Sequence, residues 1–160
     1  MIKNVLLLSL VALATLALAQ SNRPAGPPAE DLSGMYTFLA DGEYVQLNIE
    51  DAGKVTGYVS RYGSLESDRG AFLDHFIKKG ALKESRIEWT TEPVHGTWYD
   101  FKGTIGRGNG KTPNDEGYYA MRGTLVEHMT DALKKETARQ REVVLKSFPE
   151  GLGEAKEKRD

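Results

Sequence analysis

The chain has 160 residues with 21 Lys and Arg against 23 Asp and Glu, and this formal net charge of −2 argues against nucleic acid as a partner. It contains no cysteine, which excludes a disulfide framework and an anchor on a lipid-modified cysteine. Beyond its first 30 residues about 130 remain, which predicts one domain with a core of its own.

The first 19 residues have the pattern of a signal peptide. Lys3 supplies a positive start, residues 5–16 form a short apolar stretch, and Ala17 and Ala19 place small side chains before a cleavage point. A transmembrane anchor would need roughly 20 apolar residues, so we predict no such anchor in the mature form. The expectation is an exported protein, periplasmic or secreted, that is cleaved after Ala19.

The remaining chain divides into a tether, a domain and a tail. Residues 20–30 contain three prolines and no apolar periodicity, which predicts a disordered tether. The single domain is expected over residues 31–149, and the charged residues 150–160 are expected to form a flexible tail. Turn signals recur at intervals of about eight to twelve residues in the domain, which is typical of antiparallel β proteins.

The domain begins with three predicted strands. Residues 35–40 and 43–50 are joined by an Asp-Gly dipeptide, which tolerates the positive φ of a tight hairpin. The second of these strands alternates apolar and polar residues, and a third follows over residues 54–62. Gly57 within it indicates a bulge, a bend or a close approach of the backbone.

The middle of the chain predicts a short helix and more strands. The apolar residues from Phe72 onward have helical spacing, so we expect a brief helix near residues 67–73. Residues 76–82 and 86–91 then form a hairpin. Long strands follow over residues 97–105 and 117–128, separated by a glycine-rich loop.

The C-terminal part allows two interpretations. Residues 130–141 favour a helix in composition, and Asp131 can cap it. The alternative is a long hairpin in which residues 141–148 pair with the preceding strand, and residues 143–148 are the candidate for a last strand. The expected fold is therefore mainly β, about eight antiparallel strands in a meander that forms a small barrel, with one short C-terminal helix; a β-sandwich is the alternative.

The glycine and aromatic pattern of this meander resembles the calycin-type barrels, the lipocalin and avidin group. The resemblance is carried by Gly34-Met35-Tyr36 in the first strand and Gly57-Tyr58 in the third. A lipocalin-like barrel would have Gly-x-Trp in the first strand, where this chain has Gly-Met-Tyr. The resemblance therefore implies a barrel architecture and transfers no ligand residues.

Residues that could support catalysis form no recognisable motif. The loop over residues 106–112 lacks the first glycine of a phosphate-binding loop, and Pro113 blocks the helix that should follow. Histidines occur at no ligand-like interval, so we interpret them as surface or turn residues and predict no metal and no cofactor. Asp100, with aromatic neighbours, is the acid to inspect first, because such a setting can raise a pKa. The three histidines are His75, His95 and His128.

Aromatic residues are concentrated on the predicted strands. Several share a face with the apolar residues of the 43–50 strand, as ordinary core packing would require. The functional hypothesis is that this face lines a barrel too wide to fill, with Phe72, Leu73 and Phe76 at the mouth of a pocket. The predicted pocket residues are Val45, Leu47, Ile49, Trp89, Tyr99, Phe101, Tyr119, Met121, Phe72 and Phe76.

Three classes of function follow from these patterns. The first is a non-enzymatic exported barrel that binds a small apolar or amphipathic ligand in the cell envelope. The second is a structural or interaction module with a solid core, which contacts a protein or glycan through outward aromatics such as Trp98 and Tyr118. The third is an enzyme. An interior pocket would favour the first, a filled core with exposed aromatics the second, and a buried cluster of carboxylates or histidines the third.

Overall fold

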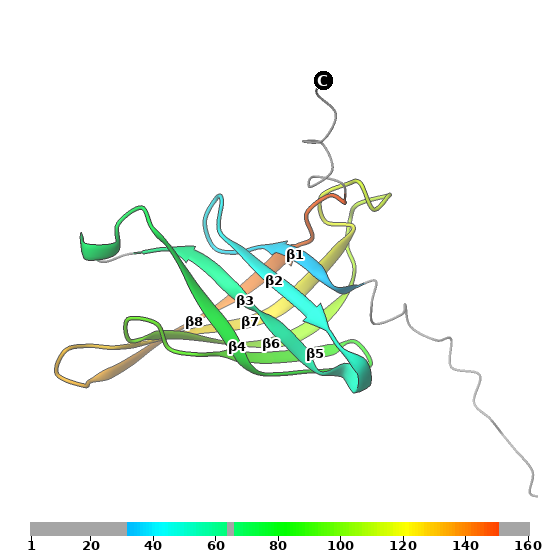
Figure 1. Ribbon diagram of the computed structural model, residues 1–160. Helices are drawn as coiled ribbons and strands as arrows, with labels where there is room; N and C mark the ends of the chain where they lie inside the picture. Colours follow the sequence, from blue (N-terminus) through cyan, green and yellow to red (C-terminus); the bar gives the residue numbers. More distant parts are fainter. Residues whose placement is uncertain (1–31, 64–65, 151–160) are drawn as a thin grey trace, which may run out of the picture.

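Eight antiparallel strands form the protein in the computed structural model, which describes residues 32–63 and 66–150 (Figure 1). The strands are β1 (Gly34–Thr37), β2 (Tyr44–Ile49), β3 (Val55–Tyr62), β4 (Phe72–Lys83), β5 (Arg86–Thr91), β6 (Thr97–Arg107), β7 (Tyr119–Thr130) and β8 (Glu136–Lys146). Two short 3-10 turns, η2 (Asp51–Gly53) and η3 (Glu66–Asp68), lie between strands. The predicted signal peptide, the predicted tether and nearly all of the predicted tail lie outside the described residues.

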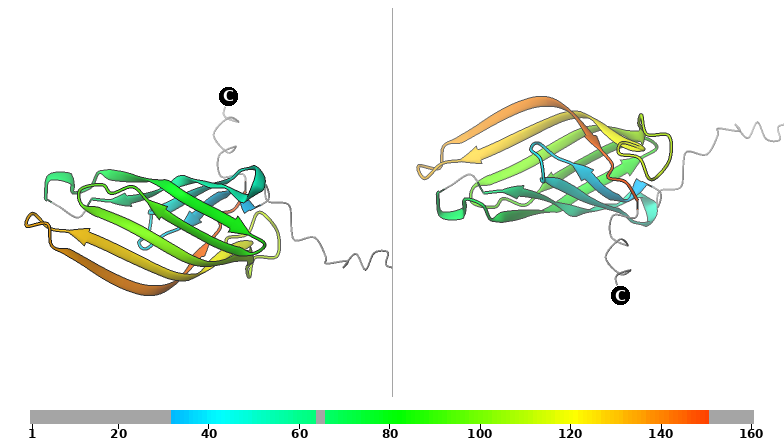
Figure 2. Two further views of the ribbon diagram at one scale, coloured as in Figure 1. Left: turned by 90° about the horizontal axis from the view of Figure 1, so that it is seen from below. Right: turned by 90° about the horizontal axis from the view of Figure 1, so that it is seen from above.

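Each strand pairs with its neighbour in sequence, so the sheet is a meander that curls into a half-barrel. Strands β1 to β3 lie over the strands from β5 to β8, and β4 passes from one side to the other (Figure 2). The two edges of the sheet meet at a bridge between Tyr36 and Ser147, where the N–H of Phe148 donates to the carbonyl of Met35 at 2.8 Å. Because β1 has only four residues, most of the outer edge of β8 has no partner strand in the described part of the chain.

The predicted alternation is confirmed in β2. Its apolar side chains point inward and are buried, and the polar side chains between them face outward, because successive residues of a strand point to opposite faces. The hairpin that connects it to β1 turns at Gly42, which has a φ of 84°. Positive φ is the conformation that an Asp-Gly dipeptide tolerates in a tight turn.

The predicted helix over residues 130–141 is wrong. These residues form the end of the β7–β8 hairpin, whose register runs from Ala120 opposite Lys146 to Thr130 opposite Glu136. Asp131 caps the turn instead of a helix, and its Oδ1 accepts the backbone N–H groups of Leu133 and Lys135, each at 2.9 Å. Helix propensity is a weak preference, and continuous pairing with β7 overrides it.

The predicted brief helix near residues 67–73 is also wrong over most of its length. Only the 3-10 turn η3 is helical there, and Phe72 already belongs to β4. A bulge between Ile77 and Lys79 shifts the register of β4 against β5. This irregularity interrupts the alternation that would have identified the strand, and the apolar residues before it then mimic helical spacing.

One apolar core fills the curl of the sheet. Trp89 and Phe101 stack within it with ring centroids 5.3 Å apart, and the core also includes buried residues from most of the other strands. Close packing of this kind is what gives a small β domain its stability. No helix in the described ranges has the length and hydrophobicity to cross a membrane.

Candidate functional site at the open end of the half-barrel

The predicted pocket residues lie in different places. Tyr119 is half-buried against the core, whereas Phe72 and Phe76 lie on the outer face of β4 and are 48% and 60% exposed. The others are buried in the packed core: Val45, Leu47, Ile49, Trp89, Tyr99, Phe101 and Met121. The middle of the half-barrel is therefore occupied by side chains, and space for a ligand must be sought elsewhere.

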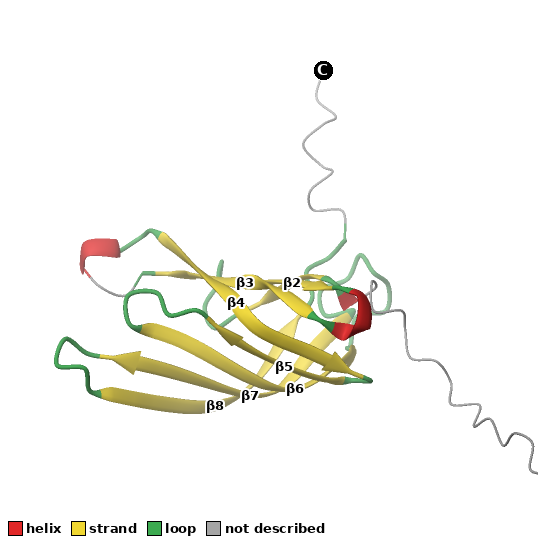
Figure 3. Ribbon diagram, turned by 60° about the horizontal axis from the view of Figure 1, so that its bottom comes forward, coloured by secondary structure: helices red, strands yellow, loops and turns green. Residues whose placement is uncertain are grey.

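One end of the interior is polar. Here η3, residues 92–96 and residues 131–135 lie together, and we call this the open end (Figure 3). Arg61 reaches it from the end of β3 with only 8% of its surface exposed. Its Nε donates to Nε2 of His75 at 3.3 Å, and its Nη1 donates to the carbonyl of Tyr62 at 3.2 Å. These two bonds fix the plane of the guanidinium group.

His75, on β4, is fully buried beside this arginine. Burial, and then the positive charge of Arg61, lowers the pKa of His75 to about 4. The imidazole is therefore neutral at neutral pH, with Nε2 free to accept the bond from Arg61. The sequence interpretation of all three histidines as surface or turn residues is wrong for this one, since it belongs to the interior.

A second group of polar side chains lies on β6, β7 and β8. The hydroxyl of Tyr99 donates to Oε1 of Glu127 at 3.3 Å, and Nη2 of Arg141 lies 2.8 Å from Oε2 of the same carboxylate. Burial raises the pKa of Tyr99, which keeps its hydroxyl protonated as a donor. Glu127 is therefore held by two partners and is not shared with Arg61.

A cavity of about 480 Å³ opens beside these groups at the open end. Thr97, Thr130, Thr137 and Ala132 add methyl groups to its wall, and Met129 in that wall is 49% exposed. The polar part of the wall includes Arg61, Asp68, His95 and Lys135. A buried cation and an exposed apolar side chain thus face the same space.

Of the two acidic residues in this wall, Asp68 and Asp131, the first contacts a histidine. Asp68 is buried, and its Oδ2 lies 2.7 Å from Nδ1 of His95. The connection ties η3 to the turn between β5 and β6, two segments far apart in sequence. The contact therefore stabilises the rim of the cavity.

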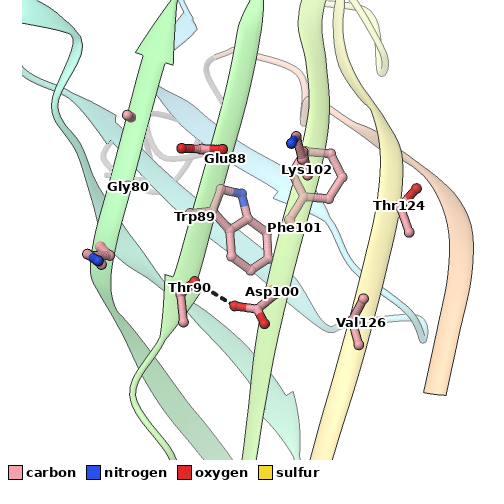
Figure 4. Close-up of a pocket in the computed structure, with 11 residues that line it drawn as sticks. Gly80, Glu88, Trp89, Thr90, Asp100, Phe101, Lys102, Thr124 and Val126 are labelled. Atoms are coloured by element: carbon pink, nitrogen blue, oxygen red, sulfur yellow. Dashed lines mark hydrogen bonds between the residues drawn. The ribbon is translucent and has the colours of Figure 1, made fainter. Parts of the chain in front are cut away.

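A second hollow, of about 720 Å³, lies on the outer face of β4 to β7 (Figure 4). There the hydroxyl of Thr90 donates to Oδ1 of Asp100 at 2.5 Å, and Nε2 of His128 lies 2.8 Å from Oδ2. The threonine thus contacts the acid and not the histidine, so the three do not form a nucleophile and its base. Asp100 is held in a surface network instead of an apolar pocket. Among the described residues no cluster of three His, Cys, Asp or Glu could hold a metal ion.

The predicted outward aromatics, Trp98 and Tyr118, are half-buried. Trp98 lies flat on the ring of His128, with centroids 4.8 Å apart, and the guanidinium of Arg107 lies 3.3 Å from the ring centre of Tyr118. Both predicted contact residues are thus partly covered by their own neighbours. The exposed aromatic rings lie on β3 and β4 instead, where Tyr62 contacts Phe72, with ring centroids 4.5 Å apart.

Sequence reasoning missed Arg61 as a site residue. The strand pattern could have identified it. Successive residues of a strand point to opposite faces, and Arg61 lies an even number of residues from the inward-facing Val55 and Val59 of β3. A charged residue at an inward position of a strand is rarely buried without a functional or structural reason. The signal is easily overlooked, because Gly57 stands at another inward position of the same strand and weakens its alternation.

A comparison with family models finds none that matches the chain, and a comparison with curated proteins likewise finds no match. The curled antiparallel sheet is compatible with a barrel-like fold, and neither comparison supports a particular family.

Proposed function

We propose that this chain is an exported, non-enzymatic binding protein that takes a small amphipathic molecule at the open end of a calycin-like half-barrel. The observation that carries the proposal is the cavity in which the buried Arg61 and the exposed Met129 face the same space. Its volume of about 480 Å³ falls in the range of small-molecule sites, roughly 300 to 1,000 Å³. Export rests on the pattern of residues 1–19.

The filled core supports a site at the end of the half-barrel and not along its axis. Trp89 and Phe101 stack where a ligand would lie in a wide barrel, and their exposed fractions are near zero. In this arrangement the packed residues support the floor of the site. Tyr99, which contacts both His75 and Arg61, connects that floor to the cavity.

The proposal predicts binding of one amphipathic molecule per chain. The full chain, expressed in an exporting host and stripped of co-purifying lipid, should bind dodecanoate in calorimetry and in native mass spectrometry. Amide shift changes should centre on Arg61, Met129 and Thr137. No saturable binding, or shift changes confined to the outer hollow around Asp100, would contradict the proposal.

Met129 provides a matched test of the apolar contact. We expect Met129→Gln to weaken dodecanoate binding about threefold to tenfold, because the methionine side chain of the unaltered protein would cover part of the apolar chain of the ligand. Val144→Gln is the control, since Val144 is a comparably exposed apolar residue of β8 outside the cavity wall. Equal effects of the two substitutions would show that Met129 is not part of the site.

The second candidate function is an interaction module with a solid core. The exposed rings of β3 and β4 favour it, because Phe76 also contacts Tyr58, with ring centroids 5.7 Å apart, and large exposed apolar patches mark contact surfaces. Shift changes confined to these rings on addition of soluble oligosaccharides, with none at the open end, would support this function over the first.

A further inference from the structure

Arg61 is a buried cation without a carboxylate partner. Within residues 32–63 and 66–150, no carboxylate oxygen lies within 4.0 Å of its guanidinium nitrogens. Charged side chains are almost never buried unpaired, because removing a charge from water without compensation is strongly unfavourable. The burial of this arginine therefore requires an explanation.

The buried acids of this region contact other groups, and Asp68, which lines the same cavity, lies 2.7 Å from Nδ1 of His95. The two carboxylate oxygens of Glu43 accept the backbone N–H groups of Ala40 and Tyr62, each at 3.1 Å. Glu127 is bound by Arg141 and by a tyrosine hydroxyl, as described above. The adjacent imidazole is neutral and adds no negative charge. Among the described residues, the positive charge of Arg61 thus has no carboxylate partner.

The guanidinium group also has unused donors. It carries five N–H bonds in one plane, and the chain uses one on Nε, for His75, and one on Nη1, for the carbonyl of Tyr62. Its Nη2 donates to no described residue. Two oxygens of a carboxylate or a phosphate fit such a planar set of donors, and their charge makes the bonds strong.

We propose that the ligand carries an oxyanion, of the carboxylate or phosphate type, and that Arg61 binds it while the apolar part lies against Met129. This inference rests on the proposed function and names the chemistry of its ligand. Lys135 in the same wall adds a second positive charge. Asp131, also in the wall, faces its own turn, where its Oδ1 accepts two backbone N–H groups.

Three probes with the same chain length separate the charge from the apolar part: dodecanoate, dodecyl phosphate and dodecanol, each titrated into the full chain below its aggregation concentration. We expect at least one of the two anions to bind at least about tenfold more tightly than dodecanol. The stronger of the two anions identifies whether a carboxylate or a phosphate source is preferred.

Substitution of the arginine supplies the second measurement. Arg61→Gln should weaken binding of the preferred anion by about tenfold or more and leave dodecanol within about twofold. Arg122→Gln removes the same charge from the outer face of β7 and should change neither. Should Arg61→Gln unfold the chain, the Nε–H resonance of Arg61 in the unaltered protein still reports the contact, since the bound anion must shift it.

The outcomes separate the two proposals. Equal binding of dodecanol and both anions, with no effect of Arg61→Gln, would overturn the oxyanion inference and leave the binding function standing. Equal losses in Arg61→Gln and Arg122→Gln would also overturn it, because only general charge attraction would then be at work. Absence of binding by all three probes would overturn the proposed function itself.

Discussion

Replacing Gly57 by alanine should lower the free energy of unfolding by about 3 kcal/mol or more. Gly57 has a φ of +129°, which L-residues rarely adopt, and a Cβ there would lie 1.9 Å from the carbonyl oxygen of Gln46. That oxygen belongs to the backbone of the neighbouring strand, so relief of the clash requires β2 and β3 to separate. Urea unfolding followed by tryptophan fluorescence measures the loss.

Two other glycines serve as controls for this substitution. A Cβ added at Gly106, on β6, would meet no atom within 4 Å, and this residue has no positive φ, so alanine there should change stability by less than about 0.5 kcal/mol. Gly34 combines a φ of +149° with open space, so Gly34→Ala isolates the backbone cost, about 1 to 2 kcal/mol. A loss at Gly57 no larger than at Gly34 would show that the strands accommodate the methyl group.

Gly57 also shows why much of the fold could be predicted from local patterns. Its place inside an otherwise regular strand indicated a bulge, a bend or a close backbone approach, and the structure confirms the close approach. The alternation in β2 likewise identified which side chains face the core. Such features depend on neighbours in sequence, and they suffice to establish an antiparallel meander.

The C-terminal hairpin shows where local patterns fail. Residues 130–141 contain strong helix formers, and nothing in their own sequence records that β7 will lie alongside them. Eleven residues of β8 pair with β7, and this pairing outweighs a propensity difference of tenths of a kcal/mol per residue. Only the distant partner decides the conformation of this segment.

The candidate site could not be predicted for a related reason. Arg61 and His75 lie on the paired strands β3 and β4, and the curl of the sheet brings Tyr99 of β6 to both of them. Predicting the open end required knowledge of which strands end there and how far the core fills the interior. Alternation showed that Tyr99 faces inward but could not show that its hydroxyl meets Glu127.

The buried histidine makes the protein less stable in mild acid. The pKa of His75 is lowered from 6.5 to about 4 in the folded chain, chiefly by burial and then by the charge of Arg61. The backbone of Glu92 and Thr97 and the carboxylate of Asp74 act in the opposite direction and raise this pKa. In the unfolded chain the ring gains its proton near its ordinary pKa. The stabilising effect of the neutral ring is therefore complete above pH 6.5 and is lost as the pH falls toward 4, by up to about 3 kcal/mol.

Protonation also removes the acceptor that orients Arg61, because Nε2 would then carry a hydrogen and two cations would face each other. We expect unfolding free energies at pH 7, 6, 5 and 4 to fall more steeply for the unaltered chain than for His75→Gln, whose side chain does not titrate. His128→Gln, which alters the part-buried network around Asp100, is the control, and an equal change of slope in both variants would show that the slope is not specific to His75. An NMR titration in which the His75 ring gains its proton near pH 6.5 in the folded chain would contradict this prediction. Such a value would require water to reach a ring that has no exposed surface.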